Sequence, residues 1–249
     1  MNGYSEQFYA YTSHGSETSA QIIASSLLAA DSVGPIASVC DFGCAQGVWL
    51  AAWKAAGVAE IQGVDGPWVD IADLQISAKA FLSFNLTDPI DLGGRTFDLV
   101  QSLEVAEHLP ASGAAAFIDN LVRHGTMVLF SAAPPGQGGE NHVNEQDYGY
   151  WRDLFAARGY RLFDAVRPLI RANPDVQSWY RYNAFLYVRD DAVEAVSSAL
   201  QATEIPPHAP VPDISPPLFR MRKALVRRLP QSLQNTLAKW KSAVAARRP

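Results

Sequence analysis

The sequence contains no run of about 18 uncharged apolar residues, which is the length that a membrane-spanning helix needs. Its first residues, MNGYSEQFYAYTSHGS, lack the order of basic and then apolar residues that is typical of a signal peptide. Hydrophobic residues make up 48% and charged residues 18% of the 249 positions, so the chain is neither disordered nor fibrous. We therefore expect a cytoplasmic protein with one well-cored domain and an appendage.

Cysteine is also scarce, since Cys40 and Cys44 are the only two in the chain. They flank CDFGC at the end of an apolar run, and a strand that turns sharply is a poor place for a structural disulfide. No further cysteine completes a zinc-binding pattern. We expect both to be small, reduced packing residues rather than redox-active or metal-binding thiols.

Acidic residues are absent from residues 218–249, which carry 9 Lys and Arg. Residues 1–217 carry 11 Lys and Arg against 25 Asp and Glu, so a net charge of −14 precedes a net charge of +9. Between the two lies TEIPPHAPVPDISPP, whose prolines exclude a helix or a central strand. The sequence therefore predicts a domain over 1–202, a semi-rigid Pro-rich linker over 203–217 and a basic tail over 218–249.

The tail shows an amphipathic helical pattern that is interrupted or restarts at Pro230. Its apolar residues recur every three or four positions, at Leu218, Met221, Leu225, Leu229, Leu233, Leu237, Trp240 and Val244. Such a helix suits an anionic membrane surface or an acidic partner, and docking on the acidic domain of the same chain is an equal alternative. Nucleic acid is less favoured as a partner, because only Phe219 and Trp240 offer stacking surfaces.

Apolar strand patterns alternate with helical patterns along the rest of the chain. Helices are expected over 17–30, with Ser16 as the N-cap, and over 48–57, 112–124 and 145–158. Seven strands are expected at 36–43, 60–65, 79–84, 97–103, 126–132, 160–166 and 180–188. Several strands are too apolar to face water, so the pattern predicts an α/β fold with a mostly parallel sheet and helices on both faces.

A glycine turn joins the first strand to the next helix in VCDFGCAQG, which contains Asp41, Gly43 and Gly47. Glycine lets the backbone turn tightly and approach a ligand, and the first helical N–H groups then face the crevice at the edge of the sheet. Asp65 ends the second strand 22 positions after Gly43, where a carboxylate can accept hydrogen bonds from both ribose hydroxyls. The pattern indicates a nucleoside-containing cofactor, but the spacing G-x-A-x-G fails the G-x-G-x-x-G pattern of dinucleotide sites.

The turn instead resembles motif I of class I S-adenosylmethionine-dependent methyltransferases, D-x-G-x-G-x-G, with Ala45 in place of the middle glycine. GVD, FNLTDPI and FDLVQSLEVAEHL resemble later motifs of that family, in the same order over about residues 36–130. The resemblance implies a Rossmann-like seven-stranded fold and S-adenosylmethionine as the cofactor. The residues that it assigns to the cofactor are Asp41, Gly43, Cys44, Ala45, Gly47, Asp65, Gly66, Trp68, Asn85, Leu86, Ser102 and Glu104.

Two of these cofactor residues depart from the family or allow two interpretations. Asn85 matches a position where the family commonly has an Asp that contacts the adenine amino group, and an amide oxygen can accept the same hydrogen bond. Trp68 either packs against the adenine or begins a helix as a core residue.

The stretch EVAEH places Glu104, Glu107 and His108 at positions i, i+3 and i+4 of an expected helical turn, so their side chains can converge. It resembles E-x-x-E-H in two metal-dependent branches of the family, the ubiquinone-pathway O-methyltransferases and the small-RNA terminal 2′-O-methyltransferases. The RNA branch adds a histidine after strand five, which His142 matches. These four residues are the predicted ligands of Mg²⁺ or Mn²⁺.

Glu107, His108 and His142 are also the predicted catalytic residues. A bound dication lowers the pKa of an acceptor hydroxyl, whereas in a metal-free enzyme His108 or His142 would act as a general base. In a third interpretation Glu104 holds water or cofactor and His108 only caps the turn. The loop SAAPPGQGGENH is a candidate lid, and the N-terminal segment with Tyr11, Ser13 and Ser16 is expected to cover the cofactor.

The expected function is O-methylation of a sugar, a glycan or a related small-molecule intermediate. GGENHVN and WYRYNAFLYV look like segments of bacterial methyltransferases of glycan assembly. The alternatives are an RNA 2′-O-methyltransferase and an inactive scaffold that binds a partner or a membrane through its basic tail. The tail also suggests a peripheral location at the inner face of the membrane.

Overall fold

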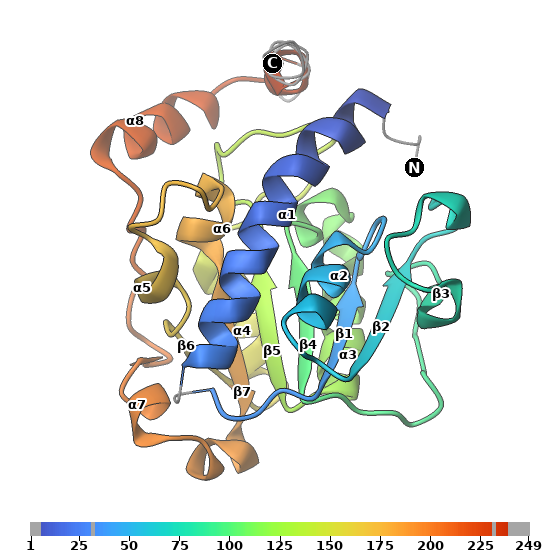
Figure 1. Ribbon diagram of the computed structural model, residues 1–249. Helices are drawn as coiled ribbons and strands as arrows, with labels where there is room; N and C mark the ends of the chain where they lie inside the picture. The colour runs from blue at the N-terminus through green and yellow to red at the C-terminus, as the bar shows by residue number, and fades with distance from the viewer. Residues whose placement is uncertain (1–5, 31–32, 231–232, 239–249) are drawn as a thin grey trace.

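The computed structural model describes residues 6–30, 33–230 and 233–238, with side chains from residue 16 onward. Within these ranges eight strands form one sheet in the order β3-β2-β1-β4-β5-β7-β6-β8 (Figure 1). Neighbours from β3 to β5 are parallel, whereas β7 runs antiparallel to β5 and β6, and β8 runs antiparallel to β6. The α/β fold and the mostly parallel sheet are confirmed.

The strands are β1 (Ser38–Phe42), β2 (Glu60–Asp65), β3 (Phe81–Ser83), β4 (Leu99–Leu103), β5 (Met127–Ser131), β6 (Tyr160–Phe163), β7 (Phe185–Arg189) and β8 (Glu204–Ile205). The α-helices are α1 (Glu6–Ala29), α2 (Val48–Ala55), α3 (Ala114–His124), α4 (Tyr148–Ala156), α5 (Arg167–Ile170), α6 (Ser178–Asn183), α7 (Ser198–Gln201) and α8 (Pro217–Val226). The 3-10 helices are η1 (Ile71–Asp73), η2 (Ala78–Ala80), η3 (Ala106–His108), η4 (Ala111–Gly113) and η5 (Asp190–Ala195).

The sheet has one strand more than the sequence predicts. All seven predicted strands are present, and β8 is added from the segment expected to be a linker, pairing Ile205 with Leu162. The sheet therefore continues past residue 202, the predicted end of the domain. The segment after β8 also packs on the domain, since the Arg152 side chain donates to the carbonyl of Ala209 at 2.6 Å and that of Arg167 to the carbonyl of Pro212 at 2.8 Å.

Two predicted elements have different bounds. The strand expected from Tyr180 begins only at Phe185, because residues 178–183 form α6, in which Tyr180 and Asn183 are buried one turn apart. Helix α1 begins at Glu6, so Ser16 lies inside it and is not its N-cap. The Ser16 hydroxyl instead hydrogen-bonds to the Tyr180 hydroxyl at 3.0 Å, and the side chains of Tyr11 and Ser13 lie outside the described residues.

Two hydrophobic cores lie on opposite faces of the sheet. Helices α1, α2, α5 and α6 cover the face toward the viewer in Figure 1, and α3 and α4 cover the other. Neighbouring strand residues alternate between the cores, as Val39 and Cys40 do. Cys40 and Cys44 are buried free thiols whose pKa values are raised by burial, which confirms the prediction of reduced packing residues.

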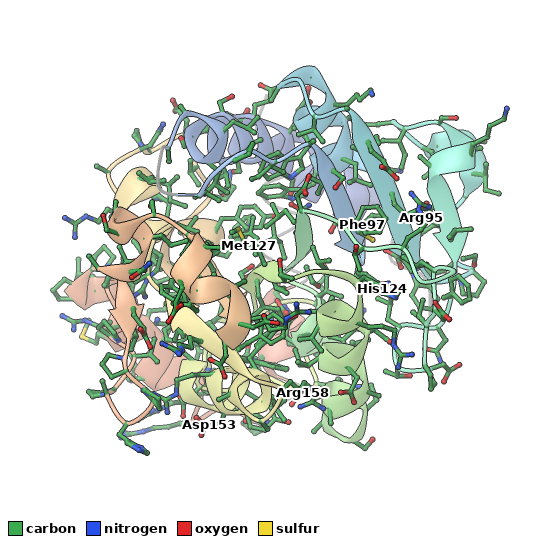
Figure 2. All side chains as sticks on the ribbon, turned by 90° about the horizontal axis from the view of Figure 1, so that it is seen from below. Arg95, Phe97, His124, Met127, Asp153 and Arg158 are labelled. Atoms are coloured by element: carbon green, nitrogen blue, oxygen red, sulfur yellow. The ribbon has the colours of Figure 1, made fainter. Side chains whose placement is uncertain are left out.

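At the end of the sheet where the parallel strands begin, polar and ring contacts fix the loop before β4. Figure 2 shows Arg95, Phe97 and His124 close together there. The Arg95 guanidinium lies 5.0 Å from the centre of the Phe97 ring. The His124 ring nitrogens lie 2.9 Å from the Arg95 carbonyl and 3.2 Å from the Ile90 carbonyl. These contacts join the loop before β4 to α3, so the opposite edge is left for the functional site.

The described part of the tail contains two helical segments. Helix α8 ends at Val226, and helix resumes over 233–238 after Pro230, so the predicted interruption is confirmed. Lys223 pairs with Asp213 at 2.6 Å, and Arg222 donates to the Gln137 carbonyl at 3.1 Å, so α8 docks on the domain. Trp240 and Val244 lie outside the described residues. No helix among the residues described is long and apolar enough to cross a membrane.

Candidate functional site

The glycine turn lies at the carboxyl edge of β1. Gly43 and Gly47 have φ angles of 87° and 81°, in the left-handed region that glycine adopts without a Cβ clash. A Cβ on Gly43 would clash with Val105, and one on Gly47 would meet Ile76 at 2.9 Å. The two glycines therefore permit both the turn and the close approach of its neighbours, and Gly47 caps the start of α2. Both predicted positions lie where a cofactor would approach the backbone.

Ala45, the residue that replaces the middle glycine of the motif, has a φ angle of 46°. This left-handed conformation costs a residue with a Cβ about 1–2 kcal/mol, which is the physical reason for a glycine at this position. The Ala45 N–H is held there by Asp65, whose Oδ2 accepts its hydrogen bond at 2.7 Å. The replacement is thus tolerated at the expense of local backbone strain.

Replacing Ala45 with glycine is expected to raise the free energy of unfolding by about 1 kcal/mol, because the left-handed strain is removed and part of the gain is lost to the greater freedom of the unfolded chain. The affinity for S-adenosylhomocysteine should stay within about threefold, since the backbone N–H is retained. Thermal unfolding and calorimetric titration measure the two effects. A loss of stability would show that the Ala45 methyl group packs favourably in the turn.

Asp65 connects the glycine turn to the end of β2. Its Oδ1 accepts a hydrogen bond from the Gly66 N–H at 2.6 Å, in addition to the bond from Ala45. Burial raises the pKa of this carboxyl, and the two backbone N–H groups offset part of the rise. Each carboxylate oxygen keeps a further lone pair, so Asp65 can still accept hydrogen bonds from ribose hydroxyls as predicted.

Asp41 is buried on β1, and burial raises its pKa from 3.8 to about 7, with a further contribution from the nearby charge of Asp65. Cys44, which was also assigned to the cofactor, lies on the side of the turn that faces the sheet: a Cβ on Gly63 would lie 2.7 Å from its sulfur. The side chain of Cys44 is therefore a packing contact of the turn.

The contribution of Asp41 to the free energy of unfolding of the ligand-free protein is expected to fall as the pH rises from about 4 to about 7. The folded state binds the Asp41 proton more tightly than the unfolded chain does, so the stability that this proton contributes is complete below pH 4 and is lost as the pH passes through the folded pKa of about 7. Asp41→Asn should remove this part of the dependence and be more stable than the wild type by about 2–4 kcal/mol at pH 8. Urea unfolding of both proteins from pH 4 to pH 8 measures the difference; parallel curves would contradict the raised pKa.

The three residues predicted near the adenine differ in how far they are exposed. Trp68 is half-buried, and its ring lies over Gly66, where a Cβ would clash with it. Asn85 is exposed, and its Oδ1 already accepts a hydrogen bond from the Thr87 hydroxyl at 3.1 Å. Leu86 is buried in the core on the α3 side, so the structure does not bring its side chain to the crevice. The adenine contacts of Trp68 and Asn85 stay predictions.

The stretch after β4 does not form the expected helical turn from Glu104. Glu104 has a φ angle of 56°, and the 3-10 helix η3 begins only at Ala106. The Glu104 carboxylate accepts hydrogen bonds from Gln137 Nε2 at 2.6 Å and Asn183 Nδ2 at 3.3 Å. The structure therefore does not group Glu104 with the other predicted metal ligands, and burial raises its pKa. Its predicted contact with the cofactor stays a prediction, as does that of Ser102, whose hydroxyl is enclosed within β4.

The other three predicted ligands meet at one point. Glu107 and His108 come from η3 and His142 from the loop after β5, and one ligand atom of each lies within 4.8 Å of the others. The two imidazole rings meet edge to face with centres 4.8 Å apart. Neither Glu107 oxygen accepts a hydrogen bond of normal geometry from any residue described. Burial, together with the charge of Glu104, raises the pKa of Glu107.

The surroundings of His108 and His142 differ, and both suit an imidazole that binds a cation. Burial is the main cause that lowers the pKa of His108 to about 3, and His142 adds to it, so the His108 ring is neutral at physiological pH. His142 Nδ1 lies 2.8 Å from Glu145 Oε1. Because a carboxylate only accepts hydrogen bonds, we assign a proton to Nδ1 of His142 in this contact, so a metal ion would bind through Nε2.

The predicted lid is anchored rather than open. Glu145 accepts hydrogen bonds from the N–H groups of Gly136 and Gly138 at 2.7 and 2.8 Å. The N–H groups of Val143 and Asn144 both donate to the Glu107 carbonyl. Glu145 was not among the predicted site residues. Its position three residues after His142 could have indicated a carboxylate that orients the histidine ring. Gln137 and Asn183, which hold Glu104, gave no comparable signal.

The model of a family described as a methyltransferase domain matches residues 13–167, which is more than half of the chain. The chain belongs to this family. S-adenosylmethionine is accordingly the cofactor of this methyltransferase, as the glycine turn and Asp65 indicate. Among curated protein sequences none matches the chain significantly. The narrower assignment to the E-x-x-E-H branch stays a prediction.

Solved structures with the same fold include methyltransferases that act on different atoms. A sugar N-methyltransferase from Streptoalloteichus shows a TM-score of 0.56 at 16% identity, covering 76% of this chain and 94% of its own. Magnesium protoporphyrin IX methyltransferase from Synechocystis, with bound S-adenosylhomocysteine, shows a TM-score of 0.52 at 18% identity, covering 76% and 90%. An O-methyltransferase family protein from Burkholderia thailandensis shows a TM-score of 0.54 at 14% identity, covering 73% of this chain and 58% of its own, so this chain spans less than two thirds of that protein. At these identities the likeness concerns the fold.

Proposed function

We propose that this methyltransferase transfers a methyl group to a hydroxyl of a sugar, a glycan or a related small molecule, with the help of a divalent metal ion. The observation that carries the proposal is the cluster of Glu107, His108 and His142. The side chain of Val105, two residues before Glu107, fills the space that a Cβ on Gly43 would need. The cluster therefore lies beside the glycine turn.

The residues at the glycine turn fit the cofactor. S-adenosylmethionine supplies a methyl group on a positively charged sulfonium sulfur. Asp65 would hold the ribose hydroxyls, and the left-handed glycines let the backbone approach the ligand closely. Burial raises the pKa values of Asp41, Asp65, Glu104 and Glu107, all near this edge, so a cationic ligand would favour their ionised forms.

The cluster also fits Mg²⁺ or Mn²⁺. One carboxylate and two imidazoles would supply three protein ligands, and the remaining coordination positions would be left to water and to the acceptor. The enclosed Glu107 oxygens, without a geometrically normal hydrogen bond from the described residues, are the donors that such an ion would satisfy.

The same geometry favours metal assistance over general-base catalysis by His108. An alcohol with a pKa of about 16 is a poor nucleophile at neutral pH, and a dication would lower that pKa. An imidazole with a pKa of about 3 is too weak a base to take the hydroxyl proton, whereas metal binding needs only the neutral form of the ring. Glu145 would act as the residue that orients His142.

A small acceptor is favoured over RNA by the position of Phe219. Its ring lies 6.0 Å from that of Tyr182, so it packs on the domain and is not free to stack on a base. Trp240, the other aromatic residue of the tail, lies outside the described residues. The sugar class itself rests on the sequence pattern around His142.

The test is a pair of measurements on the full chain. S-adenosylhomocysteine is titrated calorimetrically into metal-stripped protein, and methyl transfer from labelled S-adenosylmethionine is then measured with glycosides, amino sugars and a short RNA. We expect nucleoside binding without metal, and transfer to glycoside hydroxyls that chelation abolishes and Mn²⁺ restores. Transfer only to RNA would establish the RNA alternative, and transfer only to amines would overturn O-methylation. No nucleoside binding would favour an inactive scaffold.

A further inference from the structure

Helix α8 has two faces with different environments. On the inner face Lys223 is buried and pairs with Asp213, and Phe219 packs near Tyr182. Gly136 lies so close to α8 that a Cβ on it would clash with the Lys223 carbonyl. These contacts hold the inner face against the domain, so the opposite face of the same helix must point away from it.

The outer face carries a stripe of exposed apolar side chains. Leu218, Met221 and Leu225 are 75%, 57% and 60% exposed, and their spacing of three and four residues places them on one side of the helix. After Pro230 the exposed stripe resumes with Leu233 and Leu237. Single exposed apolar residues are normal on a protein surface, but a series aligned along α8, with two more exposed leucines in the next helical segment, is typical of an interaction site.

Basic side chains accompany the stripe. Arg222 lies beside the stripe on α8, Arg228 follows the end of that helix, and both are exposed. Arg220 and Arg227 line a cavity of about 350 Å³ between α8 and the start of α4. Residues 218–249 carry 9 basic and no acidic residues, so the charge of this part of the sequence favours an anionic partner.

The stripe lies near the functional site. Arg222 donates to the Gln137 carbonyl, and Gln137 in turn donates to Glu104 at 2.6 Å. Figure 1 shows α8 at the end of the molecule where the parallel strands finish, which is the edge that carries the metal-ligand cluster. A surface that bound the stripe would therefore face the same side as the catalytic edge.

We propose that the outer face of α8, together with residues 233–238, docks on an anionic lipid surface, so that the methyltransferase works with its catalytic edge beside the membrane. The apolar stripe would enter the boundary between headgroups and acyl chains, and the flanking arginines would contact lipid phosphates. A binding mode of this kind depends on both features at once, the exposed apolar side chains and the positive charge.

The test is flotation of the full chain with vesicles of phosphatidylcholine containing phosphatidylglycerol, compared with phosphatidylcholine alone. We expect the fraction that floats to be at least about fivefold higher with the anionic vesicles. It should fall at about 1 M salt, where the Debye length is about 3 Å. Met221→Asp combined with Leu225→Asp should reduce flotation to the level seen with neutral vesicles, because aspartate opposes both apolar insertion and attraction to anionic lipid.

The matched control replaces Ile71 and Leu169, two exposed apolar residues outside the tail, with aspartate, and this double variant should float like the wild type. Equal flotation of the stripe variant and the wild type would overturn the proposal, as would flotation of neither. Self-association that the stripe variant abolishes, without vesicle binding, would assign the stripe to a second copy of the chain. Titration of S-adenosylhomocysteine without vesicles reports on the cofactor site separately, so failure of one proposal is distinguishable from failure of the other.

Discussion

Replacing Glu107 with glutamine is expected to abolish Mn²⁺ binding and to lower methyl transfer about 100-fold or more, while the affinity for S-adenosylhomocysteine changes less than about threefold. Glutamine keeps the size of the side chain but removes its negative charge. The two remaining ligands, His108 and His142, are imidazoles, so the cluster of described residues would lose its one carboxylate. Since Glu107 is buried among the elements of the catalytic edge, no surface carboxylate can substitute for it.

The experiment is calorimetric titration of Mn²⁺ and of S-adenosylhomocysteine into metal-stripped wild type and variant, with methyl transfer measured at saturating Mn²⁺. Glu140→Gln is the matched control, because Glu140 is a half-buried carboxylate in the loop that carries His142 but lies outside the cluster, and this variant should bind Mn²⁺ like the wild type. Unchanged Mn²⁺ affinity in Glu107→Gln would reject the metal site. Full activity after exhaustive chelation would do the same for metal assistance.

Replacing Asp65 with asparagine is expected to weaken S-adenosylhomocysteine binding about 30- to 150-fold, which corresponds to about 2–3 kcal/mol. In the folded protein the two Asp65 oxygens accept the N–H groups of Ala45 and Gly66. An asparagine has one oxygen and one NH₂ group, so one backbone N–H would face another donor. The variant thus loses a charged acceptor for the ribose and also loosens the turn that positions the cofactor.

Asp73→Asn provides the control, because Asp73 is an exposed acid of the following 3-10 helix η1, and its replacement should leave the affinity within about threefold. Thermal unfolding without ligand separates a local loss of affinity from general destabilisation. If Asp65→Asn bound S-adenosylhomocysteine as tightly as the wild type, the ribose contact assigned to Asp65 would be wrong.

Local sequence patterns predicted those parts of the site that are continuous in the chain. The glycine turn depends on backbone conformations that few residues other than glycine adopt, and Asp65 follows a short apolar strand, so both are visible from neighbouring residues. The conformation of Glu104 was not visible in this way. Its spacing to Glu107 suggested a helix, but the hydrogen bonds from Gln137 and Asn183 hold it in a left-handed conformation before the helix begins.

Contacts between distant segments account for what the sequence did not predict. Glu104 meets Asn183 across 79 positions, and Arg222 meets Gln137 across 85, so no local pattern contains them. Strand β8 was missed for another reason. It has only two residues and stands directly before a Pro-rich stretch, and such a strand is stable only because β6 offers an open edge to pair with.

That edge has a consequence for any attempt to separate the tail from the domain. Strand β6 pairs with β7 on one side and with β8 on the other. A chain that ended at residue 202, where the composition changes, would leave the β8 side of Leu162 and Phe163 without a partner strand. Unpaired strand edges recruit strands from other molecules, so such a fragment would be prone to aggregate. The first residues of the Pro-rich segment therefore cover the edge of the sheet, and a soluble tail-free form would have to retain at least β8.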